Sequence, residues 1–109
     1  MSYSIKSISV FEKQVKRLLK KYPSLKADLL ELIFTLKENP EYGKPIGKGC
    51  YKVRIAIKSK GKGKSGGARV ITNFIITDHI IYLISIYDKS EKANISDKEL
   101  TELLKFIPD

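Results

Sequence analysis

Residues 51–58 have the sequence YKVRIAIK, in which apolar side chains occupy every second position. Because the side chains of a β-strand point alternately to its two faces, this stretch predicts a strand with one apolar face. Lys52, Arg54 and Lys58 then share the opposite face. The stretch therefore predicts a sheet that carries basic side chains on one side and is covered on the other.

Two apolar segments follow this strand and extend the predicted sheet. Residues 69–77, RVITNFIIT, and residues 80–87, IIYLISIY, are separated only by Asp78 and His79. Such nearly continuous apolar runs are typical of central strands, and the short link predicts that they are antiparallel neighbours. The polar, glycine-rich segment 59–67 predicts a hairpin loop before them.

Helical periodicity dominates the chain before these strands. After an alternating strand at 3–10, apolar residues recur at helical spacing over 11–22 and again over 25–36. A Tyr-Pro-Ser link separates the two helices and an Asn-Pro pair ends the second, so we expect a helical hairpin. Leu30 and Phe34 are expected to widen the buried face of the second helix.

One more helix is predicted after the strands. Ser96 and Glu99 fit a capping box, and apolar residues recur at helical spacing as far as Ile107. The segment 41–49, which contains glycines and a proline, predicts a connecting loop. We therefore expect residues 1–109 to form one α+β domain of order β-α-α-β-β-β-α, in which an N-terminal helical hairpin packs against a small antiparallel β-sheet.

The basic residues are concentrated around the first of these sheet strands. Between Glu41 and Asp78 the sequence holds nine of its 21 lysines and arginines and none of its 12 acidic residues, so the formal net charge of +9 arises in this window. Clustered basic side chains bind phosphates and release their counterions. The expected partner of this region is therefore a polyanion such as a nucleic acid.

Strand geometry predicts which of these basic residues meet. Arg69 returns beside Lys52 and Arg54 on the neighbouring strand, and Lys89 follows the last strand at the same end of the sheet. A charge within an otherwise apolar strand needs a partner or a function, which makes Arg69 the strongest candidate for a functional residue. Tyr87, on the same face, could offer an aromatic surface for stacking.

The sequence also excludes several kinds of site. The single histidine, His79, rules out a two-histidine nuclease, and the single cysteine, Cys50, rules out an internal disulfide or a multi-cysteine metal site. The residues 63–65, GKS, match the end of a P-loop, but Lys58 stands where that motif needs its first glycine. The acidic residues are too scattered to predict a two-metal site.

Nothing in the sequence indicates a membrane or a secretory pathway. No apolar run approaches the length of a membrane span, and the N-terminal segment lacks the hydrophobic region of a signal peptide. We therefore expect a cytoplasmic protein that does not bind a membrane.

Three stretches around the basic cluster carry a family resemblance. They are residues 49–54, GCYKVR, residues 64–71, KSGGARVI, and residues 86–90, IYDKS. In these stretches the chain resembles the RelE/ParE superfamily of toxins from bacterial type II toxin–antitoxin systems, and within it the HigB-like RelE toxins. The resemblance spans essentially the whole chain, including the order of helices and strands.

The resemblance implies a ribosome-dependent mRNA endoribonuclease, or mRNA interferase, which inhibits translation by cutting mRNA in the ribosomal A site. In such toxins the 2′-hydroxyl of the substrate attacks the adjacent phosphate without a metal, and a 2′,3′-cyclic phosphate and a 5′-hydroxyl result. The resemblance suggests Lys52 as the base, since a lysine crowded by cations can have a lowered pKa. Arg54 and Arg69 would stabilise charge on the phosphate, and Lys89 would protonate the leaving 5′-oxygen or anchor the phosphate.

RNA binding is a further expectation from the resemblance. Lys64 and Lys58 are expected to help hold RNA, although the sequence pattern itself favours ordinary solvated charges for Lys58, Lys60 and Lys62. Many RelE toxins stack a C-terminal tyrosine on the substrate base. The corresponding residues 92–95, KANI, contain no aromatic side chain, so either Tyr87 takes this role or the base stacks elsewhere.

The expected protein partner is a cognate antitoxin, a DNA-binding protein encoded next to this chain, which would mask the basic face with acidic residues. Two other functions stay open, a ParE-like inhibitor of DNA gyrase and a non-catalytic RNA-binding module. The four candidate catalytic residues favour the ribonuclease over the gyrase inhibitor. A shortage of exposed aromatic residues on the sheet argues against the RNA-binding module.

Overall fold

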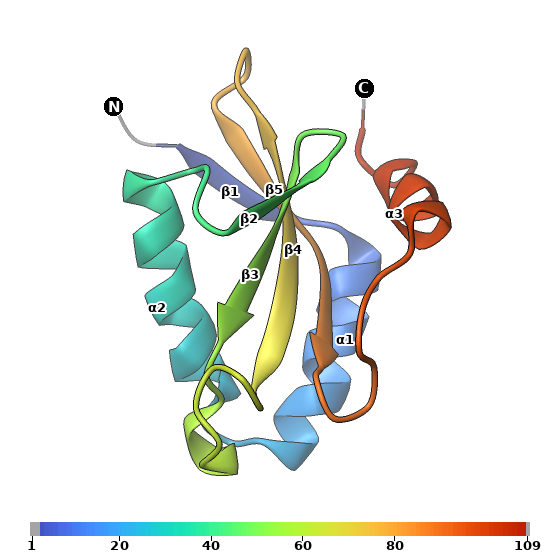
Figure 1. Cartoon of the computed structure of the whole chain (residues 1–109). Coiled ribbons are helices and arrows are strands. Elements are labelled where there is room, and N and C mark those ends of the chain that lie inside the picture. The colour runs from blue at the N-terminus through green and yellow to red at the C-terminus, as the bar shows by residue number, and fades with distance from the viewer. Residues whose placement is uncertain (1–2, 109) are drawn as a thin grey trace.

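A five-stranded sheet forms the centre of the protein, of which the computed structural model describes residues 3–108 (Figure 1). The strands lie in the order β1-β5-β4-β3-β2. Their bounds are β1 Ser4–Ser7, β2 Lys44–Gly47, β3 Cys50–Ile55, β4 Ala68–Ile75 and β5 Ile80–Asp88. The predicted antiparallel pairing of β3 with β4 and of β4 with β5 is confirmed. The central strands β4 and β5 are almost wholly buried, which explains their nearly continuous apolar sequences.

The two edge strands differ from the sequence expectation. β1 runs parallel to β5, so the sheet is mixed rather than wholly antiparallel. β2 lies within the segment 41–49, for which the sequence predicts only a loop, because Pro45 and the glycines hide any alternation. β2 is nevertheless an antiparallel partner of β3, with Lys44 opposite Lys52. This pairing adds a lysine next to the predicted basic face.

Two helices follow β1, as predicted, and each covers a different part of the sheet. They are α1 (Ser9–Lys21) and α2 (Leu25–Glu38), and they make few contacts with each other. α1 lies along β5 beyond the point where β1 ends, and there the Gln14 side-chain oxygen accepts a hydrogen bond from the Ile86 backbone N–H at 2.9 Å. In this way α1 satisfies a backbone donor that β1 is too short to reach. The buried stripe of α2 consists of Leu25, Leu29, Leu32 and Leu36.

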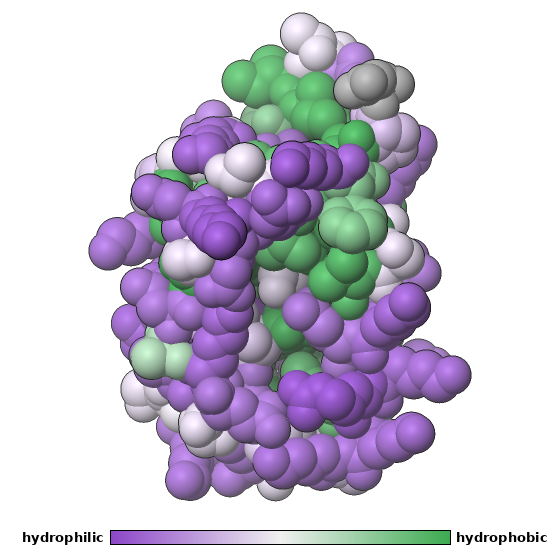
Figure 2. Space-filling model, turned by 90° about the vertical axis from the view of Figure 1, so that its right-hand side faces the viewer, coloured by the Kyte–Doolittle hydropathy of each residue, from purple (hydrophilic) through white to green (hydrophobic). Residues whose placement is uncertain are grey.

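Some apolar side chains of the helices remain exposed. Leu30 and Phe34 do not widen the buried face of α2 as predicted, since they are 49% and 70% exposed. Each lies about 100° or more around the helix from the nearest leucine of the buried stripe. The last helix, α3 (Asp97–Leu104), buries Leu100 and is followed by the exposed Phe106. Figure 2 views this side of the molecule and shows hydrophobic residues gathered in its upper part, bordered by hydrophilic ones.

The predicted capping box at the start of α3 is confirmed. The Ser96 hydroxyl oxygen accepts from the Glu99 backbone N–H at 3.1 Å, and the Glu99 carboxylate accepts from the Ser96 N–H at 3.2 Å. We expect Ser96→Ala to destabilise α3 by about 1 kcal/mol, because an N-terminal backbone donor loses its partner. The measurement is amide hydrogen exchange, which should become faster in α3 and stay constant in α2. Equal protection of α3 in both proteins would contradict the prediction.

A buried ion pair holds the ends of three elements together. The fully buried Asp88 carboxylate accepts hydrogen bonds from the Lys60 ammonium and the Tyr22 hydroxyl, both at 2.5 Å, and from Ser90. Burial opposes ionisation of Asp88, but the hydrogen bonds from Lys60, Tyr22 and Ser90 outweigh it and hold the pKa of this carboxyl well below its usual range. The prediction that Lys60 is a solvated loop charge is therefore wrong. Its side chain is only 9% exposed, because a buried carboxylate at the end of β5 needs a counter-charge.

Candidate active site

One row of candidate side chains crosses three strands of the sheet. Arg54 of β3 lies opposite Arg69 of β4, which lies opposite Tyr87 of β5. Directly opposite residues of neighbouring strands point to the same face, so these three side chains share one face. Lys52 stands two positions before Arg54 and points to that face as well, opposite Ile71. The structure thus brings Lys52, Arg54 and Arg69 together.

Arg69 is almost wholly buried, with 7% of its surface exposed. Its guanidinium donates hydrogen bonds to the carbonyl oxygens of Lys64 at 3.0 Å, Ala68 at 3.2 Å and Ser65 at 3.3 Å. Burial and the nearby charge of Arg54 lower the pKa of Arg69. Arg69 is therefore a fixed positive charge below the surface of the face, and it also holds the β3–β4 loop in place.

Lys52, Lys44, Arg69 and Lys89 form a cationic cluster in which the charges of the other three act on Lys52. Its Nζ atom is 3.3 Å from the Asn94 side-chain oxygen, in the loop that leads to α3. Burial and the charges of Lys44, Arg69 and Lys89 lower the pKa of Lys52. Each of these causes disfavours the protonated amine, so Lys52 gives up its proton more readily than an ordinary lysine.

Lys89 directly follows β5 and is held at two points. Its backbone N–H donates to the Gly67 carbonyl oxygen at 3.0 Å, and its ammonium donates to the Ala93 carbonyl oxygen at 3.0 Å. A Cβ atom at Gly67 would lie 2.1 Å from the Ile55 carbonyl oxygen, so the chain can approach β3 this closely only with glycine. The position of Lys89 near Lys52 therefore depends on a close contact between the β3–β4 loop and the sheet.

Tyr87 does not form the exposed stacking surface that the sequence suggests. The residue is 6% exposed, and its hydroxyl has no hydrogen-bond partner within residues 3–108. The Lys92 ammonium lies 5.8 Å from the centre of the ring. Burial is the main cause that raises the pKa of Tyr87. The ring is covered because it belongs to the central strand β5, so a base cannot stack on it in this structure.

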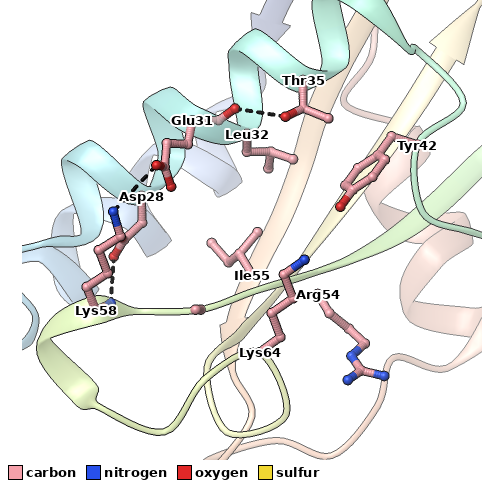
Figure 3. A pocket seen from close by; sticks show the side chains of 10 residues that line it. Asp28, Glu31, Leu32, Thr35, Tyr42, Arg54, Ile55, Lys58 and Lys64 are labelled. Carbon is pink, nitrogen blue, oxygen red and sulfur yellow. Dashed lines mark hydrogen bonds and ion pairs between the residues drawn. The ribbon is translucent and has the colours of Figure 1, made fainter.

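Lys58 and Lys64 lie apart from the row. Lys58 opens a short 3₁₀ turn, η1 (Lys58–Lys60), and its ammonium pairs with Glu31 of α2 at 3.4 Å, so it leaves the face on which the alternation placed it. Lys64 is exposed and lines, together with Arg54, a cavity of about 160 Å³ between α2 and β3. Figure 3 shows its ammonium pointing into the space between these two elements.

The sequence also matches a known protein family. The family model described as "RelE toxin of RelE / RelB toxin-antitoxin system" matches residues 9–107. The chain belongs to the RelE toxin family. The match is to RelE toxins at large, so assignment to the HigB-like subgroup stays a prediction.

Two solved structures have the same fold as this RelE-family chain. A double mutant of the E. coli toxin RelE in the free state is similar with a TM-score of 0.63 and 18% identity, over 99% of this chain and 100% of that one. A toxin–antitoxin complex, RelBE2 from Mycobacterium tuberculosis, gives a TM-score of 0.60 and 15% identity, over 86% of this chain and 95% of that one. At such identities the similarity is one of fold.

Two residues of this RelE-family toxin join the site although the sequence patterns do not single them out. Lys44 lies opposite Lys52 and contributes to the lowered pKa of that amine. Tyr42 lines the cavity of Figure 3 together with Arg54 and Lys64. Both residues reach the site through β2 and the turn before it. The lack of acidic residues from Tyr42 onward is the one sequence signal that includes them.

Three further features of this RelE-family toxin concern membrane spans, metal ligands and the single cysteine. In residues 3–108, no helix is long and apolar enough to cross a membrane. Among the same residues, no group of three His, Cys, Asp or Glu side chains is placed to hold a metal ion. Cys50 is buried, and burial raises the pKa of its thiol, as expected for a structural residue rather than a nucleophile.

Proposed function

We propose that this RelE-family toxin is an endoribonuclease that cuts mRNA in the ribosomal A site and so inhibits translation in the cytoplasm. The observation that carries the proposal is the position of Lys52 beside Arg54 and Arg69 on one sheet face, where burial and the neighbouring cations lower the pKa of its amine. A lysine that loses its proton more easily can act as a base, and the neighbouring cations can bind the phosphate. A merely solvated basic strand would need neither property.

In the proposed reaction the Lys52 amine takes the proton of the substrate 2′-hydroxyl, and the 2′-oxygen attacks the adjacent phosphorus. The bond from phosphorus to the 5′-oxygen breaks, and Lys89 gives that oxygen a proton. The products are a 2′,3′-cyclic phosphate and a 5′-hydroxyl. The scheme uses side chains alone and requires no metal or other cofactor.

Arg54 and Arg69 are proposed to stabilise the negative charge that develops on the phosphate. Arg54 is exposed on β3 and can donate hydrogen bonds directly to the phosphoryl oxygens. Arg69 is held by three carbonyl oxygens, so its charge needs no rearrangement during the reaction. Lys58 and Lys64, at the edge of the site, are proposed to hold the RNA strand through its phosphates.

The proposed protein partner is a cognate antitoxin encoded next to this chain. The similar structure from M. tuberculosis is a toxin–antitoxin complex, which supports a partner of this kind. A protein that covers the row of Lys52, Arg54 and Arg69 would block access to phosphate. Acidic side chains are the natural complement of this surface.

The test is primer extension on mRNA incubated with the protein, with and without programmed ribosomes. We expect cuts within the A-site codon when ribosomes are present, and fragments that end in a 2′,3′-cyclic phosphate. Intact mRNA together with inhibited DNA supercoiling would overturn the proposal and indicate a gyrase inhibitor. RNA that is bound by the protein but never cut would also overturn it.

A further inference from the structure

Two adjoining hollows lie along the edge of β3 beside the proposed active site. β2 pairs with β3 only as far as Lys52, so the edge of β3 beyond this residue is not covered by another strand. One hollow, of about 280 Å³, extends from Lys44 and Lys52 to Arg54. The other is the cavity between β3 and α2. Tyr42, Arg54 and Lys64 line both hollows, which therefore form one groove that begins at the proposed base.

The backbone fixes the place of Tyr42 in this groove. At Gly43 a Cβ atom would lie 2.7 Å from the Lys52 carbonyl oxygen and 2.9 Å from a methyl carbon of Val53, and φ is +110°. Only glycine allows both this approach and this backbone conformation. The contact holds residues 42–44 against β3, so Tyr42 is set next to Arg54 while Lys44 is set opposite Lys52.

The groove combines the two groups that bind a single nucleic acid strand. The hollow that begins at the proposed base is lined by four cations, namely Lys44, Lys52, Arg54 and Lys64, which can follow a chain of phosphates. The hollow beside α2 is also lined by Lys58 and by the carboxylates of Asp28 and Glu31. Tyr42 is half-buried, so one part of its ring is anchored while another part faces the groove, and Figure 3 shows its hydroxyl end pointing toward the Lys64 ammonium. Stacking on an aromatic side chain within a basic groove is how proteins hold unpaired bases.

We propose that Tyr42 is the stacking platform for an RNA base next to the scissile phosphate, and that the groove between β3 and α2 receives that nucleotide. The proposal rests on the proposed ribonuclease function, since it locates one nucleotide of the same substrate. An acidic protein segment would also be attracted to the four cations, but it would not need the flat ring.

The test compares Tyr42→Leu, which keeps an apolar side chain, with Tyr42→Phe, which keeps the ring. Phe34→Leu is the matched control, because Phe34 is an exposed aromatic residue of α2 outside both hollows. The assay is single-turnover cleavage of mRNA on programmed ribosomes. Tyr42→Leu should lose roughly tenfold in the rate at low protein concentration, while Tyr42→Phe and Phe34→Leu should stay within about twofold of the unchanged protein.

A second arm uses mRNA with an abasic ribose at one position of the A-site codon at a time. At the position whose base stacks, the missing base should slow the unchanged protein about as much as Tyr42→Leu does, and should have no further effect on that variant. The inference is overturned if Tyr42→Leu cleaves normal mRNA as fast as the unchanged protein. It is also overturned if that variant binds the antitoxin less tightly while cleavage is unaffected, which would assign the groove to the protein partner.

A third arm separates this inference from the proposed function. It measures binding of each protein to a short RNA with 2′-O-methyl groups, which cannot be cleaved by attack of the 2′-oxygen. Suppose that the unchanged protein cuts no mRNA but binds this RNA, and that Tyr42→Leu binds it less tightly. The ribonuclease proposal then fails and the base site stands. If it cuts mRNA and all three variants match it in both assays, the base site fails and the ribonuclease stands.

Discussion

Lys52→Met is expected to lower the rate of mRNA cleavage by roughly 10²- to 10⁴-fold, the range that a general base contributes, while the fold persists. Methionine fills most of the space of the lysine stem but can neither take a proton nor carry a charge. The rate is measured in single turnover on programmed ribosomes, and folding is checked by thermal unfolding. Lys62→Met is the matched control, because it removes the same charge from an exposed position of the β3–β4 loop. Its expected effect is less than about threefold.

The pH dependence tests the role of Lys52 as a base. The neutral amine is the active form, so the rate should rise with pH and level off above the pKa of Lys52, which burial and the charges of Lys44, Arg69 and Lys89 lower from the ordinary 10.5. Lys44→Met removes one of these charges, so the inflection should move to higher pH and the rate at neutral pH should fall. Full toxicity of Lys52→Met in bacteria, or an unchanged pH profile for Lys44→Met, would show that Lys52 is not the base.

Asp88→Asn is expected to reduce the free energy of unfolding by about 3–5 kcal/mol, because it leaves the Lys60 ammonium buried without a counter-charge. The measurement is urea denaturation at neutral pH. Lys60→Met should also destabilise the protein strongly, since the Asp88 carboxylate then loses its close partner. Lys21→Met is the control, since Lys21 is exposed and 4.0 Å from the same carboxylate, and it should reduce the free energy of unfolding far less than Lys60→Met does. If Lys21→Met and Lys60→Met reduced the free energy of unfolding equally, this account of the buried pair would be contradicted.

Acid adds a second test of the same ion pair. The pKa of Asp88 is lowered in the folded protein relative to its ordinary value of 3.8. Its contribution to stability is therefore fully present above about pH 4 to 5 and is lost as the pH falls below the ordinary pKa, because the unfolded chain takes up the proton first. Between about pH 5 and pH 2, the free energy of unfolding of Asp88→Asn should fall less than that of the unchanged protein. If both fall by the same amount, the Asp88 carboxylate is not the group that titrates.

The sequence predicts the parts of the fold that depend on local pattern. The alternation at 51–57, the apolar runs that become β4 and β5, and the leucine stripe of α2 each specify an element through its own side chains. β2 escapes this kind of prediction, because a four-residue edge strand containing Pro45 is specified by its partner β3 rather than by its own sequence. The parallel direction of β1 depends in the same way on β5, which lies far along the chain.

The residues of the candidate site likewise fall into those that local sequence pattern predicts and those that it does not. Lys52 and Arg54 follow from alternation within one strand, and Arg69 follows from a single hairpin. Sequence alone cannot place Lys44 or Tyr42, because their positions depend on β2. It also cannot distinguish Lys60, which is buried against Asp88, from the exposed Lys62 in the same loop. Two lysines with equal local surroundings differ because only one of them meets a carboxylate from a distant strand.

The parallel pairing of β1 with β5 has a consequence for the order in which the chain can fold. Ser4 of β1 pairs with Ile80 of β5, so the β1 edge of the sheet cannot form until most of the described chain has been synthesised. Contacts between such distant segments carry a large loop-closure entropy and slow the approach to the native state. Lys89 is also placed only when β5 has joined β4, because its backbone bonds to the β3–β4 loop. The nascent chain therefore carries an incomplete cationic cluster while the ribosome is still making it.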